Sequence, residues 1–227
     1  MNKEYPSSLA AVDDVFDGAT IMFGGFGEAG IPENLIRALV EKGVRHLTAI
    51  SNSPGADEEL GLYWLLKNGQ IDHMIASYPS PAGKYFTKLY QEGKVKLELR
   101  PQGTLAEQIR AGGAGIAAFY VPVGVGTTLA EGKETRSFNG EEHLLEHALK
   151  ADFAFVKAYS GDRWGNLCYR RTARNFNPIM AMAGSVTIAE VEKMVPLGDL
   201  DPEAVVTPGI FVNRIVRGEK YEKAATS

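Results

Sequence analysis

The feature that most constrains the fold is a glycine-rich turn between a strand and a helix near the start of the chain. Residues 20–32 have the sequence TIMFGGFGEAGIP, with four glycines in the seven positions 24–30. The apolar residues before the glycines are typical of a buried strand, and Pro32 stands where helices often begin. Glycine permits backbone conformations and close approaches that a Cβ atom would forbid. We therefore expect a bulky, anionic ligand to lie against bare backbone and a helix N-terminus.

Strand-like and helix-like segments alternate from residue 20 onward, which predicts an α/β fold: a mostly parallel sheet with helices on both faces. The expected strands are Thr20–Phe26, His46–Ser51, Ile71–Ser77, Val95–Leu99, Ala117–Val123 and Phe153–Ala158. The expected helices are Glu33–Glu41, Asp57–Lys67, Gly83–Gln91, Thr104–Ala111 and Glu141–Leu149. No linker or repeat interrupts this pattern. We expect a single domain over residues 1–227, with a core of about 12–220 and a frayed tail at 221–227.

Charge and cysteine content restrict the function classes. The 24 basic and 28 acidic residues give a net charge of -4, which argues against a nucleic-acid surface. The single cysteine, Cys168, excludes an internal disulfide and favours a reducing compartment. Neither a leader sequence nor an apolar run of the ~18–20 residues that cross a bilayer is apparent, so we expect a cytoplasmic protein without membrane contact. His143 and His147 share a predicted helix without a third ligand, so we expect no metal.

The glycine turn by itself fits several interpretations. Residues 25–30 (GFGEAG) match the dinucleotide-binding pattern G-x-G-x-x-G. Glu28 would bring negative charge toward a pyrophosphate, and Ser51, Asn52 and Ser53 stand where that fold places an acidic residue for the ribose. No Gly-Lys-Ser/Thr follows the turn, which excludes a Walker motif. The alternative that the glycines only pack helix against strand stays open.

A longer pattern is more specific. Asp17 to Pro32 fits Asp-Gly, two residues, three apolar residues, Gly-Gly-Phe, three residues, Gly, one residue and Pro. This pattern closely resembles the first subunit of family I coenzyme A transferases, and the resemblance extends from about Val12 to about Lys220. Further blocks that resemble the family in the same order are Pro101–Glu107, Ile109–Gly115, Glu131–Glu134, Lys157–Ala158, Gly161–Leu167 and Ala173–Asn177. The chain looks most similar to the 3-oxoacid group, and GDRWGNL at 161–167 favours the 3-oxoadipate type.

The resemblance implies a reaction and a partner. Such enzymes move coenzyme A from succinyl-CoA to a 3-oxo acid (3-oxoadipate or acetoacetate) by a ping-pong mechanism, and coenzyme A is a substrate rather than a resident cofactor. The family's nucleophilic glutamate lies on a separate B subunit or a C-terminal domain, and no stretch here resembles its Ser/Glu-Asn-Gly block. We therefore expect no catalytic residue in this chain, and a B subunit that completes a heterodimer or an α2β2 heterotetramer.

The resemblance also implies the site residues. Asn52 and Gln102 would hold the acyl group, and the glycine turn would approach coenzyme A. Ser53-Pro54 departs from the family's usual Asn-Ala, and Pro79 and Pro81 stiffen a nearby loop, which puts the acyl specificity in doubt. The expected coenzyme A-binding residues are Gly24, Gly25, Phe26, Gly27, Glu28, Ala29 and Gly30.

Three alternatives stay open from the residues alone. Glu28 is itself a carboxylate beside backbone donors, although a solvent-facing acid near a helix N-terminus is the simpler interpretation. The chain as a whole is compatible with a standalone hydrolase or sugar-phosphate isomerase. It is also compatible with a non-catalytic coenzyme A-binding module.

Overall fold

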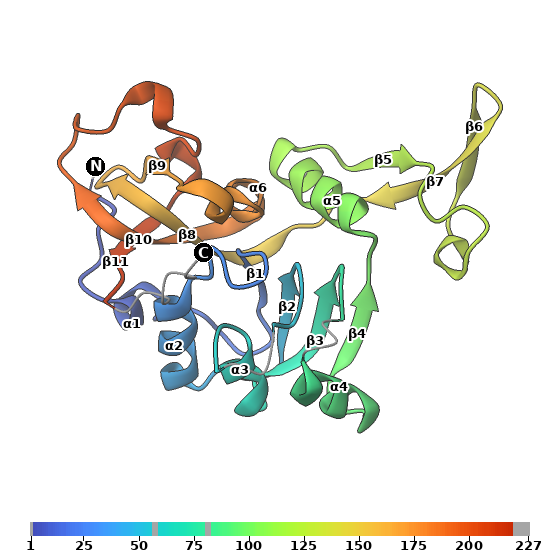
Figure 1. Cartoon of the computed structure of the whole chain (residues 1–227), viewed down its shortest axis with the longest axis horizontal. Helices are drawn as coiled ribbons and strands as arrows, with labels where there is room; N and C mark the ends of the chain where they lie inside the picture. Colours follow the sequence, from blue (N-terminus) through green and yellow to red (C-terminus); the bar gives the residue numbers. More distant parts are fainter. Residues whose placement is uncertain (1, 56–58, 80–82, 220–227) are drawn as a thin grey trace.

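The computed structural model describes residues 2–55, 59–79 and 83–219, and its centre is an eight-stranded sheet (Figure 1). Seven strands run parallel in the order β11-β10-β8-β1-β2-β3-β4, and β9 pairs antiparallel with β8. The strands are β1 (Thr20–Phe23), β2 (Leu47–Ser51), β3 (Ile71–Ala76), β4 (Lys96–Leu99), β8 (Ala151–Asp162), β9 (Leu167–Cys168), β10 (Gly184–Val195) and β11 (Arg214–Arg217).

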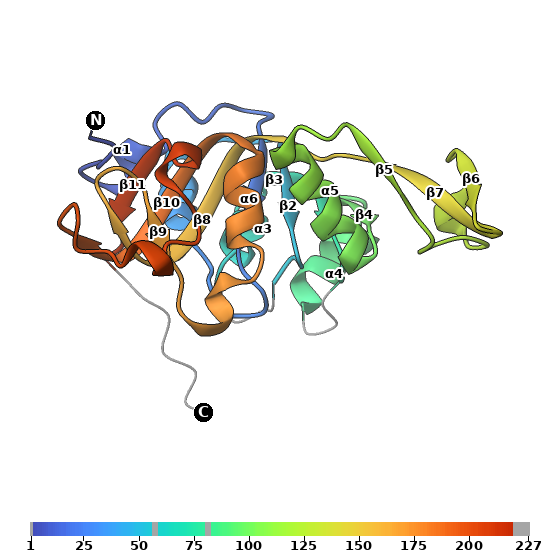
Figure 2. The ribbon, with the colours of Figure 1, turned by 90° about the horizontal axis from the view of Figure 1, so that it is seen from above.

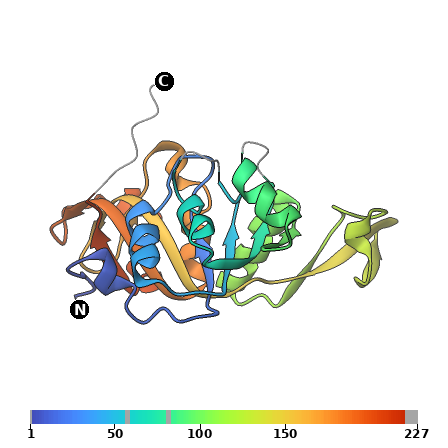
Figure 3. The ribbon, with the colours of Figure 1, turned by 90° about the horizontal axis from the view of Figure 1, so that it is seen from below.

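Helices cover both faces of this sheet, as predicted. Figure 2 shows α5 and α6 in front of the strands, and Figure 3 shows the opposite face, which α1 to α4 cover. Two separate hydrophobic clusters correspond to these two layers. The helices are α1 (Ser8–Ala11), α2 (Glu33–Lys42), α3 (Tyr63–Lys67), α4 (Lys84–Gln91), α5 (Gln102–Ala114) and α6 (Asn177–Ala183).

The central strand β1 illustrates why the chain folds this way. Its residues Ile21, Met22 and Phe23 are all buried, although their side chains alternate between the two faces. Ile21 and Phe23 belong to the cluster under α1 to α4, and Met22 belongs to the cluster under α5 and α6. A strand with no solvent-facing side needs consecutive apolar residues, which is what the sequence has.

No helix in the described part of the chain is long and apolar enough to cross a membrane.

A second, three-stranded antiparallel sheet extends away from the body in all three views (Figures 1, 2 and 3). It contains the one element whose type was predicted wrongly, because a helix was expected over residues 141–149 and residues 141–147 form β7 instead. The short run HLLEH fits either period, and pairing with strands on both sides decides the outcome. Its strands are β5 (Ala118–Val121), β6 (Thr135–Phe138) and β7 (Glu141–His147).

Two other secondary-structure predictions, the end of the strand set and the extent of the helix at 57–67, were incomplete. The strand set was expected to end at residue 158, but β10 and β11 extend the sheet beyond β8. The helix expected over 57–67 is limited to α3, because Glu59 and Gly61 have φ values of 53° and 59°, which interrupt a right-handed helix. Residues 57 and 58 and the expected tail at 221–227 lie outside the described residues.

Candidate functional site

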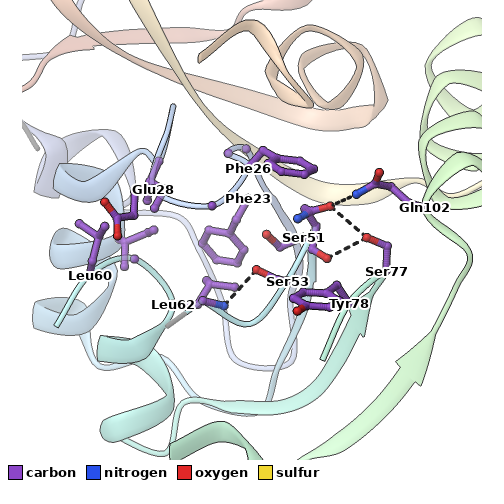
Figure 4. A pocket seen from close by; sticks show the side chains of 18 residues that line it. Phe23, Phe26, Glu28, Ser51, Ser53, Leu60, Leu62, Ser77, Tyr78 and Gln102 are labelled. Atoms are coloured by element: carbon purple, nitrogen blue, oxygen red, sulfur yellow. Dashed lines mark hydrogen bonds between the residues drawn. The ribbon is translucent and has the colours of Figure 1, made fainter. Parts of the chain in front are cut away.

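A cavity of about 520 Å³ opens at the carboxyl ends of β1, β2 and β3. This is the edge at which parallel α/β sheets bind ligands. Figure 4 shows Leu60 and Glu28 at one end of the cavity and Ser51, Ser77, Tyr78 and Gln102 at the other. The apolar lining residues are Phe23, Phe26, Ile31, Ile36, Leu60 and Leu62, and the polar or charged ones are Glu28, Ser51, Asn52, Ser53, Ser77, Tyr78 and Gln102.

Asn52 is the centre of the polar end. It follows β2 directly, is only 5% exposed, and its Oδ1 accepts hydrogen bonds from Ser77 Oγ at 3.0 Å and from Gln102 Nε2 at 2.7 Å (Figure 4). Ser77 follows β3, and Gln102 begins α5 after β4. Because two donors point at Oδ1, the Asn52 amide is turned so that its own NH₂ group is left to donate elsewhere. The structure thus brings Asn52 and Gln102 into direct contact, as expected of residues that serve one ligand.

The glycine turn forms the opposite wall as a tight hairpin. Phe26 and Ala29 exchange two backbone hydrogen bonds of 3.0 and 3.1 Å, and Gly24 N–H donates to Phe155 O at 2.9 Å. Gly25 and Gly27 have φ values of 121° and 57°, which only glycine adopts without strain. Several amides that were expected to face a ligand therefore bond within the protein.

A buried asparagine from α6 explains two of the glycines. Asn177 is fully buried, its Oδ1 accepts from Lys157 N–H at 2.8 Å, and its Nδ2 donates to Gly30 O at 3.0 Å. A Cβ atom on Gly24 would lie 1.8 Å from Asn177 Oδ1, and one on Gly30 would lie 2.7 Å from Asn177 Nδ2. Asn175 adds a hydrogen bond of 2.9 Å from its Nδ2 to Ala29 O. Asn177 therefore fixes the glycine turn in place, and positions 24 and 30 must be glycine to leave room for its side chain.

The N-terminus of α2 does not face the cavity with free donors, which corrects the expectation of an anion site there. The carboxylate of Glu190, on β10, accepts from Asn34 N–H at 2.8 Å, Leu35 N–H at 3.2 Å and Asn34 Nδ2 at 2.7 Å. An internal carboxylate thus satisfies the helix end that an external anion would otherwise occupy. Burial raises the pKa of Glu190 to about 7, against the opposing effect of the Asn34 hydrogen bonds.

The expected coenzyme A-binding residues divide into two groups. Ala29 and Gly30 lie behind the cavity, where they contact Asn175 and Asn177. The other five line it: Gly24, Gly25, Phe26, Gly27 and Glu28. Of the two departures from the family pattern, Ser53 lines the cavity and Pro81 lies outside the described residues. Ser77, Asn177 and Glu190 were not predicted, although the resemblance block Ala173–Asn177 contained a signal for Asn177.

The cavity carries little charge. Glu28 is its one charged lining residue within the described chain, and its side chain is exposed rather than buried. No lysine or arginine of that part lines it. Cys168 does not line it either, and burial raises the pKa of its thiol, which keeps it protonated. His143 and His147, expected on a helix, lie on β7 in the distant small sheet. Apart from Glu28, the described lining thus consists of amides, hydroxyls, glycines and apolar side chains.

Comparisons with known proteins identify relatives of this chain. The coenzyme A transferase family model matches residues 7–218. The chain is 54% identical over 217 residues to the A subunit of the 3-oxoadipate CoA-transferase of Pseudomonas putida. This alignment covers 95% of this chain and 94% of that protein. It is 49% identical over 223 residues to the A subunit of the succinyl-CoA:3-ketoacid coenzyme A transferase of Helicobacter pylori. This second alignment covers 98% of this chain and 95% of that protein.

Solved structures share the fold. An acyl-CoA transferase of Escherichia coli O157:H7, in a thioester complex with CoA, superposes with a TM-score of 0.84 at 23% identity. It covers 97% of this chain, and this chain spans about half its length (48%). The glutaconate coenzyme A-transferase of Acidaminococcus fermentans has a TM-score of 0.81 at 19% identity and covers 95% of this chain and 75% of its own.

Proposed function

Because this chain belongs to the coenzyme A transferase family, we propose that it is the A subunit of a 3-oxoacid coenzyme A transferase. The enzyme moves coenzyme A from succinyl-CoA to a 3-oxo acid, either 3-oxoadipate or acetoacetate. The relatives named as A subunits, at 49–54% identity over nearly the whole chain, support both the reaction and the need for a B subunit.

The single observation that carries the proposal is a cavity whose described lining has binding groups but no buried carboxylate to act as the nucleophile. Asn52, Ser77 and Gln102 converge at its polar end, whereas Glu28 is its one charged side chain within the described residues and is exposed. A carboxylate that reacts with a thioester must be desolvated to be effective, and water must be excluded from the intermediate. Such a cavity is suited to be one wall of a site that a partner closes.

The reaction then runs as a ping-pong exchange. A glutamate carboxylate supplied by the partner attacks the succinyl-CoA carbonyl, which releases the coenzyme A thiolate and leaves a mixed anhydride. The thiolate attacks the glutamyl carbonyl of this anhydride, so that succinate leaves and a glutamyl-CoA thioester forms. The 3-oxo acid carboxylate attacks that thioester, and the same two steps in reverse order release the 3-oxoacyl-CoA and the free glutamate.

The polar end matches the acceptor's chemistry. A 3-oxo acid carries a keto oxygen, which is an acceptor, two carbons from its carboxylate. The Asn52 NH₂ group is left free to donate because its Oδ1 accepts from Ser77 and Gln102. We assign Asn52 and Gln102 to this oxygen, and the glycine turn to the thioester side of the substrate. Coenzyme A acts as a substrate, and no further cofactor enters this scheme.

The remaining parts of the proposal concern assembly and location. We propose an αβ unit that pairs into an α2β2 heterotetramer, in which each site is shared by the two kinds of subunit. We also propose a cytoplasmic location, for which the single, buried Cys168 is the supporting feature.

Reconstitution tests the proposal. The purified chain, the purified candidate partner and the mixture of the two are assayed with succinyl-CoA and with 3-oxoadipate, acetoacetate or acetate. We expect transfer in the mixture alone, with both 3-oxo acids favoured over acetate. Thioester hydrolysis or sugar-phosphate isomerisation by the chain alone would contradict it, and so would tight coenzyme A binding with no activity on adding the partner. Equal rates with acetate would contradict the 3-oxo assignment.

A further inference from the structure

Leu60 lines the cavity but belongs to a segment with no regular structure. It lies between Glu59 and Gly61, whose φ values are 53° and 59°. A non-glycine residue in the left-handed region, such as Glu59, is strained and persists only where its surroundings hold it. The position of Leu60 in the cavity therefore depends on what holds its two neighbours.

Both neighbours are held by side chains that do not line the cavity. The carboxylate of Glu33, on the first turn of α2, accepts a buried hydrogen bond of 2.6 Å from Gly61 N–H through Oε2. The indole Nε1 of Trp64, on α3, donates to Glu59 O at 2.7 Å. One fixed point thus lies on each side of Leu60.

A third residue joins these two supports. Arg37, one turn after Glu33 on α2, donates from Nε to Glu33 Oε1 at 2.8 Å. Its guanidinium carbon also lies 3.5 Å from the centroid of the Trp64 ring, in the geometry of a cation–π contact. Glu33, Arg37 and Trp64 form one network, which we call the α2–α3 clamp. Because the Glu33 carboxylate serves Gly61 and Arg37 with separate oxygens, a neutral amide cannot replace it fully.

We propose that the α2–α3 clamp is a positioning device that fixes Leu60 as part of the apolar wall of the cavity and thereby sets the affinity for the acyl-CoA substrate. Figure 4 shows Leu60 at the end of the cavity away from Gln102, beside Glu28. The clamp thus acts on the part of the substrate that lies away from the Asn52–Gln102 end. This inference rests on the proposed function, because the affinity in question is that for succinyl-CoA.

The test is the kinetics of Glu33→Gln in the reconstituted complex. Loss of a charge-assisted hydrogen bond of this kind should raise the KM for succinyl-CoA about 5- to 20-fold and leave kcat within about threefold of wild type. Trp64→Phe keeps a ring against Arg37 and removes only the bond to Glu59, so its KM rises by about 2- to 5-fold. In the double variant, KM rises by less than the product of the two single-variant increases, because Glu33 and Trp64 both hold Leu60 in place. The matched control is Glu92→Gln, directly after α4, which removes ion pairs with Lys88 at 3.9 Å and Lys94 at 2.8 Å and leaves KM unchanged.

The outcomes separate the clamp from the function. An active wild-type complex in which Glu33→Gln and Trp64→Phe leave KM unchanged overturns the clamp and leaves the proposed function intact. A fall in kcat with unchanged KM and a lowered melting temperature also overturns it, because this is the behaviour of a residue that only stabilises the fold. An inactive wild-type complex contradicts the proposed function itself.

Discussion

Replacement of Gly24 by alanine tests the way in which the glycine turn is built. Gly24 is not among the residues with positive φ, so an alanine there suffers no backbone strain. Its Cβ would lie 1.8 Å from Asn177 Oδ1 and 2.7 Å from Asn177 Cγ, far inside ordinary contact distance. The whole cost therefore comes from the collision with one side chain.

The magnitude follows from how firmly that side chain is held. Asn177 is fully buried, and its amide bonds to Lys157 N–H at 2.8 Å, Gly30 O at 3.0 Å and Ala173 O at 2.9 Å. Moving the amide away breaks about two such bonds in the interior, at about 1 kcal/mol each. The overpacking adds about 1–3 kcal/mol. We expect Gly24→Ala to lower the free energy of unfolding by about 3–5 kcal/mol.

Urea unfolding of the purified chain, followed by circular dichroism, measures this change. The control is Gly103→Ala, at an exposed position of α5 where an added Cβ would have no atom within 4 Å, and for which we expect an increase of up to about 1 kcal/mol. In an Asn177→Ala background the collision is absent, so Gly24→Ala should cost less than about 1 kcal/mol. The explanation is refuted if Gly24→Ala costs less than about 1 kcal/mol in the otherwise unchanged chain, or costs the same in both backgrounds.

Three further predictions concern other parts of the molecule. Gln102→Ala should lower kcat of the reconstituted enzyme about 10- to 100-fold without loss of assembly by size-exclusion chromatography, and wild-type turnover would make Gln102 merely structural. Burial raises the pKa of Glu190 from an ordinary 4.5 to about 7, so its contribution to stability is complete below pH 4.5 and is lost as pH rises to 7. Relative to Glu190→Gln, the free energy of unfolding of the unmodified chain should therefore fall by about 3 kcal/mol over this range, and a constant difference would contradict the assignment. Glu146, 3% exposed, joins the small sheet to α5 through Gln108 at 3.0 Å, so Glu146→Ala should speed proteolysis within residues 116–147, and an unchanged cleavage rate would show that the sheet is held elsewhere.

The sequence predicts the parts of the site that follow from local pattern. The apolar run Ile21–Phe23 indicates a strand buried on both faces, and parallel strands must end at one edge of a sheet. The resemblance to the family placed Asn52, after β2, and Gln102, after β4, in one acyl pocket, and a hydrogen bond of 2.7 Å joins them. Strand direction explains why both positions come to the same edge of the sheet.

The supports of the site could not be predicted in this way. Glu190 caps a helix that begins 157 positions earlier in the chain, at Glu33, and no local pattern links an acid on a late strand to that helix end. Asn177 lies 147 residues from Gly30 in the chain. The need for an asparagine at one position and a glycine at the other becomes clear only from the close packing of α6 against the glycine turn. The run at 141–147 was mistaken for a helix because its period is ambiguous and its pairing partners decide its structure. Long-range contacts therefore account for most of what was missed.

The account's central claim is that this chain forms one wall of a site whose nucleophile lies on another subunit. Incubation of the reconstituted complex with succinyl-CoA, followed by rapid denaturation and intact-mass analysis, locates the covalent intermediate. We predict that the partner subunit gains the mass of a coenzyme A thioester and that this chain stays unmodified. A thioester on this chain, at Glu28 or any other glutamate, would contradict the account.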